Sequence, residues 1–497
     1  MAKKTINKEL TGAQDLYNFL FEACNIIRGP VSQDNFKDYI TPLLYYKRIS
    51  DVYDEETEEA LISSGGDKEY ASLPEQHRFV IPDGCHWQEV RERTENLGAA
   101  IVGAMRQIEI ANPDTLYGVL SMFSSQKWTN KAILNDSKIR DLIEHLSKRK
   151  LGNKDYPADL MGDAYEILLK KFADDSKAQA GEFYTPRSVV RLLVHILDPQ
   201  PGETVYDPAC GSGGMLIEAI RYMHDDSLCC GSIFGQEKNV VNAAIAKMNL
   251  FLHGASDFNV MQGDTLRDPK ILQGGNIAKF DCVIANPPFS LENWGATEWS
   301  SDKYKRNIYG TPSDSCGDYA WIQHMICSMS SGKGRMAVVM PQGILFRGNQ
   351  EAEIRKQLVE SDLIEAVVTL RDKLFYGTGL SPCFLIIRRM KQAHHSGRIL
   401  MIDGSKILTQ KRAQNILEEN DIDRLYSLYQ NYSDEEDYSR IVTLQEIRDK
   451  EYNLSPNRYV VYHKEEIRPY AEVLAEFKQA YADVKRLENE FSLLINA

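Results

Sequence analysis

The sequence predicts an α/β protein with a helical N-terminal domain, a doubly wound parallel sheet and a C-terminal helical tail. Residues 156–410 alternate short apolar runs with helix-like segments, the pattern of a mostly parallel sheet covered by helices. The regions on either side carry apolar residues at steps of three and four, which is the spacing of amphipathic helices. We therefore expect domains at residues 1–155, 156–410 and 411–497.

The N-terminal domain is predicted to be helical because residues 16–22 and 39–47 repeat apolar side chains at helical spacing. Residues 63–78 are mostly polar and contain two glycines and a proline, so we expect a loop there.

A glycine-rich loop opens the central domain. An apolar run at residues 204–206 predicts a strand, the loop follows it, and residues 215–220 predict a helix. Strand, glycine-rich turn and helix begin a nucleotide-binding βαβ unit. Leu216 replaces the third glycine of the dinucleotide pattern, which favours a compact ligand, and an acidic residue before the loop suits a cationic ammonium group. The loop residues expected at the ligand are Asp207, Gly211, Ser212, Gly213 and Gly214.

Two carboxylates are predicted at the ends of the next two strands. Residues 232–237 form the second strand and end in Glu237, where a carboxylate can accept both hydroxyls of a ribose. Residues 258–264 form the third and end near Asp264, which can accept an adenine amino group. An isolated acidic side chain is more often a solvated surface residue. The functional assignment of Glu237 and Asp264 therefore depends on the order of the four motifs.

A fourth motif follows the apolar strand at residues 280–285. Two consecutive prolines end that strand, and open α/β sheets bind ligands at the carboxyl ends of their strands. The side-chain carbonyl of Asn286 and a backbone carbonyl can accept both N–H groups of an amino group on a flat ring, and Phe289 can stack on that ring. The candidate catalytic residues are Asn286, Pro287, Pro288 and Phe289.

In this order, the loop, the two acids and the Asn-Pro-Pro-Phe turn resemble the S-adenosylmethionine-dependent, adenine-type amino-methyltransferases of DNA. Residues 181–187 resemble the family's segment that precedes the glycine loop, an order that matches its gamma arrangement. The resemblance implies a Rossmann-like methyltransferase domain, a base flipped out of the duplex, no catalytic metal, and further contacts to S-adenosyl-L-methionine from Glu182, Phe183, Tyr184, Thr185, Pro186 and Arg187.

Residues 159–166, residues 452–460 and the helical N-terminal third resemble the modification subunit of type I restriction-modification systems. This resemblance implies methylation of adenine N6 in double-stranded DNA, with sequence specificity supplied by a separate specificity subunit. It also implies a restriction subunit in the same system and two modification subunits per specificity subunit. After the Asn-Pro-Pro-Phe turn we expect strands at 335–341, 363–370, 382–388 and 399–403, the last two forming a hairpin.

Composition limits the remaining functions. The hydrophobic content of 43% is ordinary for a soluble globular protein, and no apolar run of membrane-spanning length or signal-peptide core is visible, so we expect a cytoplasmic protein. The nine cysteines are scattered without a C-x-x-C pair, which predicts reduced thiols and no metal site. A net charge of −13 is unusual for a protein that binds DNA alone. Either a local basic face binds the DNA, with Lys148, Arg149, Lys150, Lys303, Lys305 and Arg306 as candidates, or a partner supplies most of the DNA contacts; the charge favours the partner.

The residues from about 464 onward predict one long helix with an apolar stripe. The stripe either folds back on its own catalytic domain or docks on helices of a specificity subunit. Its members are Tyr470, Leu474, Phe477, Tyr481, Val484, Leu487, Phe491 and Leu494.

Three other functions compete with DNA methylation: a methyltransferase for another planar amine or amide, a non-catalytic assembly subunit with a relic cofactor fold, and a fused endonuclease-methyltransferase. The segment before the glycine loop and the large helical region argue against the first. The presence of Asn286 and Asp207 argues against the second, and the length of the chain argues against the third. The DNA recognition sequence cannot be read from this chain.

Overall fold

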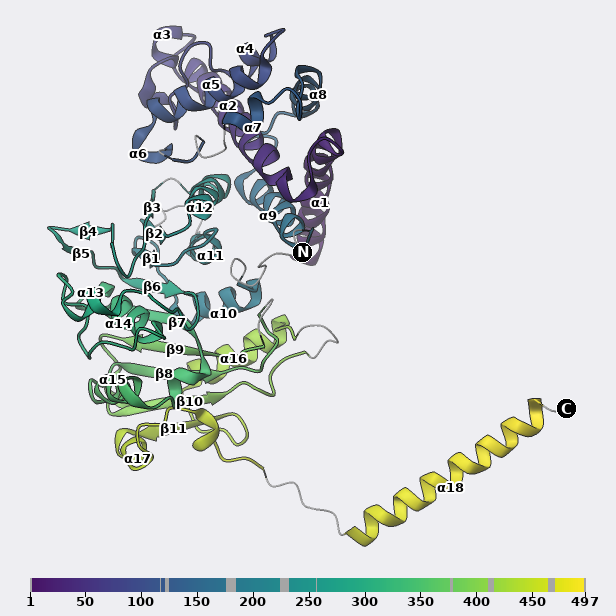
Figure 1. Cartoon of the computed structure of the whole chain (residues 1–497), viewed down its shortest axis with the longest axis vertical. Helices are drawn as coiled ribbons and strands as arrows, with labels where there is room; N and C mark the ends of the chain where they lie inside the picture. The colour runs from purple at the N-terminus through teal and green to yellow at the C-terminus, as the bar shows by residue number, and fades with distance from the viewer. Residues whose placement is uncertain are drawn as a thin grey trace.

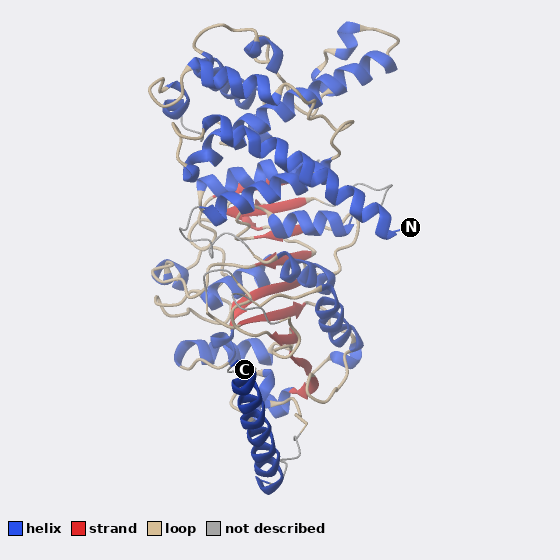
Figure 2. Ribbon diagram, turned by 90° about the vertical axis from the view of Figure 1, so that its right-hand side faces the viewer, coloured by secondary structure: helices blue, strands red, loops and turns tan. Residues whose placement is uncertain are grey.

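The computed structural model describes residues 2–116, 118–120, 125–175, 185–223, 232–255, 257–375, 379–409, 415–463 and 470–495. Along the long axis of the molecule, an N-terminal group of helices is followed by a large sheet with helices on both faces (Figures 1 and 2). A single C-terminal helix stands apart from both (Figure 1).

The N-terminal helices share one apolar core with the start of the catalytic region. Buried residues from the first two helices pack with Met248 and Phe251, which belong to a helix of the sheet region. Residues 63–78, predicted as a loop, include two short helical turns, the first of which is capped by Asp67. The described helices are α1 (Ala2–Ile27), α2 (Phe36–Ser63), α3 (Lys68–Ala71), α4 (Trp87–Arg91), α5 (Leu97–Ala111), α6 (Pro113–Leu116), α7 (Ser125–Thr129), α8 (Asp136–Leu146) and α9 (Ala158–Asp175).

A nine-stranded sheet forms the centre of the molecule, in the order β11-β10-β8-β9-β7-β6-β1-β2-β3. The chain moves outward from β1 to β3 and then returns to the other side of β1 with β6, so the order reverses between β1 and β6. Such a reversal is where doubly wound folds bind their ligands. The strands are β1 (Val205–Asp207), β2 (Ile233–Glu237), β3 (Phe258–Gln262), β6 (Cys282–Ala285), β7 (Arg335–Pro341), β8 (Ile364–Thr369), β9 (Pro382–Arg388), β10 (Arg398–Asp403) and β11 (Ser439–Thr443); β4 (Leu272–Gln273) and β5 (Asn276–Ile277) form a separate hairpin.

Helices cover both faces of this sheet, which confirms the predicted doubly wound fold. Alternate strand residues point to opposite faces, so the central strands contribute to two apolar clusters. One cluster includes α10 (Arg187–Leu197), α11 (Gly214–Met223), part of α12 (Val240–Leu252) and α16 (Glu419–Asn431). The other includes α14 (Asp318–Ser328), α15 (Asn349–Glu360) and α17 (Leu444–Asp449), and α13 (Ala296–Ser300) contributes Trp299 to it.

Two sequence-based expectations about the sheet are wrong. β9 and β10 do not form a hairpin: β9 lies antiparallel between β7 and β8, and β10 pairs in parallel with β8. The last strand is β11, which pairs antiparallel with β10 beyond the position expected for the final strand. The sheet therefore continues past residue 410, where we expected the catalytic domain to end.

The C-terminal helix α18 (Tyr470–Ile495) does not fold back on the sheet (Figure 1). Six side chains of its stripe are exposed, from 51% for Val484 to 79% for Tyr470. Among the helices that the structure describes, none is long and apolar enough to cross a lipid bilayer.

Candidate active site

The glycine loop is shaped by two residues in the left-handed region of backbone space. Gly211 has φ 53° and Gly213 has φ 85°, conformations that a side chain makes costly. The loop starts at Asp207, the last residue of β1, whose carboxylate accepts the backbone N–H of Ala209 at 2.9 Å. The sequence Asp-Pro-Ala-Cys-Gly-Ser-Gly-Gly therefore makes a tight turn that leads directly into α11.

Asp207 is an acid placed where its charge is poorly solvated. Its side chain is buried, and this burial raises the pKa of Asp207 to about 8. The neighbouring charge of Glu237 acts in the same direction, while the N–H of Ala209 opposes it. A buried acid of this kind gains most from a positively charged ligand, and a perturbed carboxyl at a sheet switch point is typical of a functional site.

Glu237 connects the end of β2 to the glycine loop. One carboxylate oxygen accepts the backbone N–H of Gly211 at 3.0 Å, and the other accepts that of Asn239 at 2.7 Å. Burial raises the pKa of Glu237. Because each carboxylate oxygen has two acceptor positions, both oxygens keep capacity for the hydroxyls of a ribose.

Asp264 lies one strand further along the same edge, just after β3. One of its oxygens accepts the backbone N–H groups of Leu266 and Arg267 at 3.2 and 3.3 Å. The other pairs with Lys238 at 2.8 Å, which joins the loops after β2 and β3. Asp207, Glu237 and Asp264 thus stand at the carboxyl ends of three adjacent parallel strands.

The Asn-Pro-Pro-Phe turn follows β6, the neighbour of β1 on its other side. The amide nitrogen of Asn286 donates to the hydroxyl of Thr185 at 2.9 Å. The amide oxygen of Asn286 is buried and accepts no hydrogen bond from the described residues. A buried carbonyl oxygen without a donor is unfavourable, which makes this oxygen a candidate acceptor for a ligand.

The segment before α10 meets the turn through Thr185, while Pro186 precedes the helix and Arg187 begins it. Arg187 pairs with Asp163 of α9 at 3.4 Å and lies 3.9 Å from Glu218 of α11, so it links the segment to the N-terminal helices. The other three residues predicted at the cofactor, Glu182, Phe183 and Tyr184, lie outside the described residues.

The remaining part of the turn is aromatic. Phe289 is half-buried and meets Phe375 edge to face, with 6.3 Å between the ring centroids. Pro287 is buried and Pro288 is exposed. The sequence motifs do not identify Phe375. This residue follows the carboxyl end of β8, and open α/β sheets bind their ligands at the carboxyl ends of strands.

A doubly wound sheet with this acidic glycine loop and an amino-group acceptor at the switch point defines a class of protein, the S-adenosylmethionine-dependent amino-methyltransferases. The family model described as N-6 DNA Methylase matches residues 156–467, and the HsdM N-terminal domain matches residues 16–146.

Similar proteins are methylase subunits of type I restriction enzymes. The chain is 35% identical over 471 residues to the MjaVII methylase subunit of Methanocaldococcus jannaschii, covering 90% of this chain and 78% of that relative. It is 31% identical over 396 residues to the HindI methylase subunit of Haemophilus influenzae, covering 76% and 84%. A crystal structure of a type I restriction-modification methyltransferase subunit from Streptococcus thermophilus superposes with a TM-score of 0.77 at 26% identity, covering 91% of this chain and all of that one.

The chain belongs to the methylase subunits of type I restriction enzymes, within the N-6 DNA methylase family. It is therefore an adenine-specific DNA methyltransferase that uses S-adenosylmethionine. The predicted family, activity and cofactor are confirmed.

Proposed function

We propose that Asn286, Pro287 and Phe289 capture a flipped adenine and that the glycine loop, Glu237 and the 182–187 segment hold the cofactor beside it. The observation that carries this assignment is the buried amide oxygen of Asn286, which accepts no hydrogen bond from the described residues. An N–H group of an exocyclic amine is a donor of the kind this oxygen requires.

The catalytic problem is the weak nucleophilicity of adenine N6, whose lone pair is delocalised into the ring. The side-chain oxygen of Asn286 and the backbone carbonyl of Pro287 accept the two N–H groups and favour the pyramidal form, in which the lone pair is available. These contacts strengthen as positive charge develops on the nitrogen, so they stabilise the transition state more than the ground state.

The residues around the loop fit S-adenosylmethionine because the buried acids favour a cationic ligand. When bound, S-adenosylmethionine supplies a methyl group attached to a positively charged sulfur. Asp207 and the loop backbone hold the end that carries its ammonium group, Glu237 accepts from its ribose, and Asp264 accepts from its adenine. We assign the segment 182–187 to the methionine end of the cofactor, and its residue Thr185 contacts the catalytic turn.

The target base must leave the duplex to reach Asn286, because a stacked base cannot present its amino group to a turn at a sheet edge. Phe289 replaces the lost stacking on one face of the base. Phe375 packs against the edge of Phe289 and keeps that ring in place.

We further propose that the chain works in the cytoplasm within a complex that contains two modification subunits, one specificity subunit and a restriction subunit. The net charge of −13 favours a partner subunit that makes most of the contacts to DNA. In each of the two short basic runs, residues 148–150 and 303–306, the arginine is already paired with an acid. Arg306 is buried and paired with Asp302, and Arg149 is paired with Asp15.

The test is methylation in cells. The chain is co-expressed with its specificity subunit, and host DNA is sequenced for N6-methyladenine. Wild type should methylate one defined sequence, Asn286→Ala should methylate none, and the matched change Asn276→Ala in the β4–β5 hairpin should behave as wild type. Wild-type methylation by Asn286→Ala would show that the mechanism is wrong.

A further inference from the structure

The catalytic turn ends at a strained residue. Ser290 follows Phe289 and has φ 50°, a conformation that is uncommon for a residue with a side chain. Its backbone N–H donates to a carboxylate oxygen of Asp318 at 2.7 Å. Asp318 is completely buried and is the first residue of α14. A buried carboxylate thus fixes the backbone of the residue that directly follows the turn.

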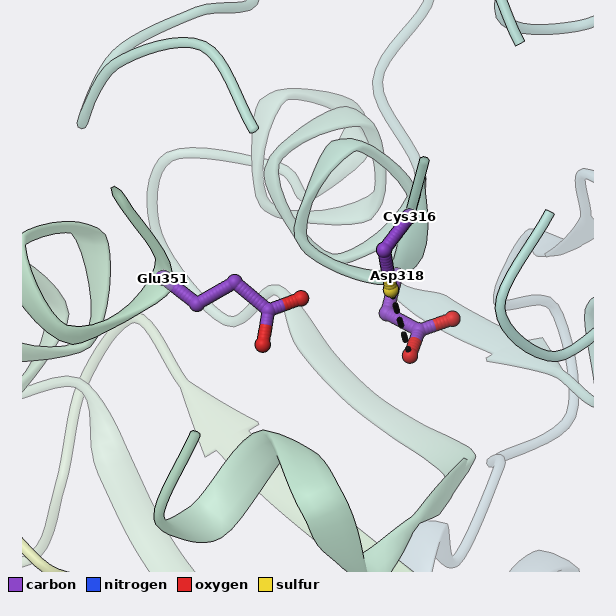
Figure 3. Close-up of side chains that lie close together, drawn as sticks. All are labelled: Cys316, Asp318 and Glu351. Carbon is purple, nitrogen blue, oxygen red and sulfur yellow. Dashed lines mark hydrogen bonds between the residues drawn. The ribbon is translucent and has the colours of Figure 1, made fainter. Parts of the chain in front are cut away.

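Asp318 is itself fixed by other charged groups. Its second oxygen pairs with the guanidinium of Arg347, which lies just before α15, and accepts the thiol of Cys316 at 3.3 Å. Arg347 also donates to the sulfur of Cys316 at 3.0 Å and pairs with Glu351 at 3.0 Å. Figure 3 shows Cys316, Asp318 and Glu351 gathered from α14, α15 and the residues before α14.

Cys316, Asp318 and Glu351 bring their ligand atoms within 4.8 Å of one another, a spacing that also suits a metal ion. However, the guanidinium of Arg347 contacts all three side chains and already places a positive charge among them. This cluster is therefore better described as an ion-pair network than as a metal centre. It connects to the end of the catalytic turn through Asp318, which accepts the backbone N–H of Ser290.

We propose that Asp318 is a positioning residue for methyl transfer. It fixes the Asn286–Phe289 turn through the N–H of Ser290, and Arg347, held by Glu351, fixes Asp318. This inference rests on the proposed role of the turn. The acceptors on Asn286 and Pro287 need an accurate position because a displacement of about 1 Å in a reacting geometry costs about 100-fold in rate.

The experiment uses the full chain in complex with its specificity subunit and a DNA duplex that carries the recognition sequence. Asp318→Ala should lower kcat about 100-fold while the KM for DNA and the calorimetric affinity for S-adenosylmethionine stay near wild type. Asp318→Asn keeps an oxygen that accepts from Ser290, so it should return kcat to within about 10-fold of wild type. Arg347→Met should give an intermediate kcat, because Asp318 then lacks its anchor.

The matched control is Glu203→Ala. Glu203 and Arg335 form another buried ion pair, at 2.7 Å, near the opposite end of the strands. Loss of this ion pair should lower the free energy of unfolding without lowering kcat per folded molecule. Equal kcat losses for Asp318→Ala and Glu203→Ala, or a wild-type kcat for Asp318→Ala, would overturn the proposal.

Two further results separate the possible failures. If Asp318→Ala does not fold, Arg347→Met decides, and a wild-type kcat in that variant overturns the proposal. If Asn286→Ala methylates normally, the proposed function itself fails, whatever the result for Asp318.

Discussion

In the proposed cofactor site, Asp207 links the affinity for S-adenosylmethionine to pH. Its pKa in the fold, about 8, lies above the ordinary value of 3.8, so the ligand-free fold loses stability as pH rises through this window. A cationic cofactor favours the ionised form. We therefore expect affinity for S-adenosylmethionine to rise with pH, by at most about 10-fold per unit, and to level off above about pH 8.

The variant Asp207→Asn should remove this dependence, weaken cofactor binding and stabilise the ligand-free chain at alkaline pH. Calorimetry and urea unfolding between about pH 6 and pH 9 measure both effects, with the exposed Asp449→Asn as control. An affinity that stays constant with pH in the wild type would contradict the assignment.

Glu237 provides a second prediction at this scale. Glu237→Ala should weaken binding of S-adenosylmethionine by roughly 1–3 kcal/mol, because it removes charge-assisted bonds to the ribose. It also releases the backbone of Gly211, so the loss should lie toward the upper end of that range. Calorimetry measures it against Glu75→Ala, an exposed acid of the N-terminal region, and unchanged affinity would exclude the ribose role.

Phe289 provides a third prediction at the residue scale. Phe289→Ala should weaken capture of the flipped base by about 1–3 kcal/mol, the usual contribution of base stacking, and leave cofactor affinity intact. The measurement is KM for DNA in the complex, together with fluorescence of 2-aminopurine at the target position. Phe289→Tyr, which retains an aromatic ring, is the control, and equal results for the two variants would argue against stacking.

Most of the candidate site could be located from local sequence because each of its motifs follows the end of one strand. The glycine loop, Glu237 and the Asn-Pro-Pro-Phe turn all have this property. Asp318, Arg347 and Phe375 could not be predicted in the same way. They come from separate elements, and only the packing of α14, α15 and the loop after β8 brings them to the turn.

The same limit applies to the strands. Apolar runs located β7, β8, β9 and β10 within one residue, but periodicity says nothing about which strands are neighbours. The short connection between β9 and β10 suggested a hairpin, whereas in the structure it crosses β8. β11 was missed because its sequence, Ser-Arg-Ile-Val-Thr, is short and partly polar, as suits an edge strand.

The glycine loop allows a direct test of backbone shape. Gly213→Ala should destabilise the ligand-free chain by about 1–2 kcal/mol, because φ 85° is unfavourable for alanine. Gly214→Ala is the matched control, since that residue begins α11 and an added Cβ meets no atom within 4 Å. Urea unfolding compares the two, and equal stabilities would show that the loop relaxes freely.

Two features of the whole molecule indicate a partner protein: its acidic net charge and the exposed stripe of α18. A helix with this much uncovered apolar surface favours docking on a partner over folding back on its own chain. Removal of residues 464–497 should leave a folded protein that binds S-adenosylmethionine but no longer assembles with the specificity subunit. Sequence-specific methylation should disappear with assembly.

A milder variant tests the stripe itself. Phe477→Asp should prevent co-elution with the specificity subunit in size-exclusion chromatography, whereas Lys478→Asp, a neighbouring exposed position, should not. Co-elution of the truncated chain, or methylation of a defined site by the chain alone, would contradict docking through α18.

The position of β6 beside β1 allows the outer loops to differ between DNA targets without moving the proposed reacting groups. The glycine loop, proposed to hold the cofactor, leaves β1, and the Asn-Pro-Pro-Phe turn, proposed to bind the base, leaves β6; these strands are hydrogen-bonded neighbours. Neighbouring strands lie about 4.8 Å apart, a spacing set by the peptide backbone alone. In the proposed assignment, main-chain hydrogen bonding thus sets the separation between the two strands that carry the methyl donor and the acceptor. Outer loops and partner surfaces can change with each DNA target while the reacting groups keep the same distance.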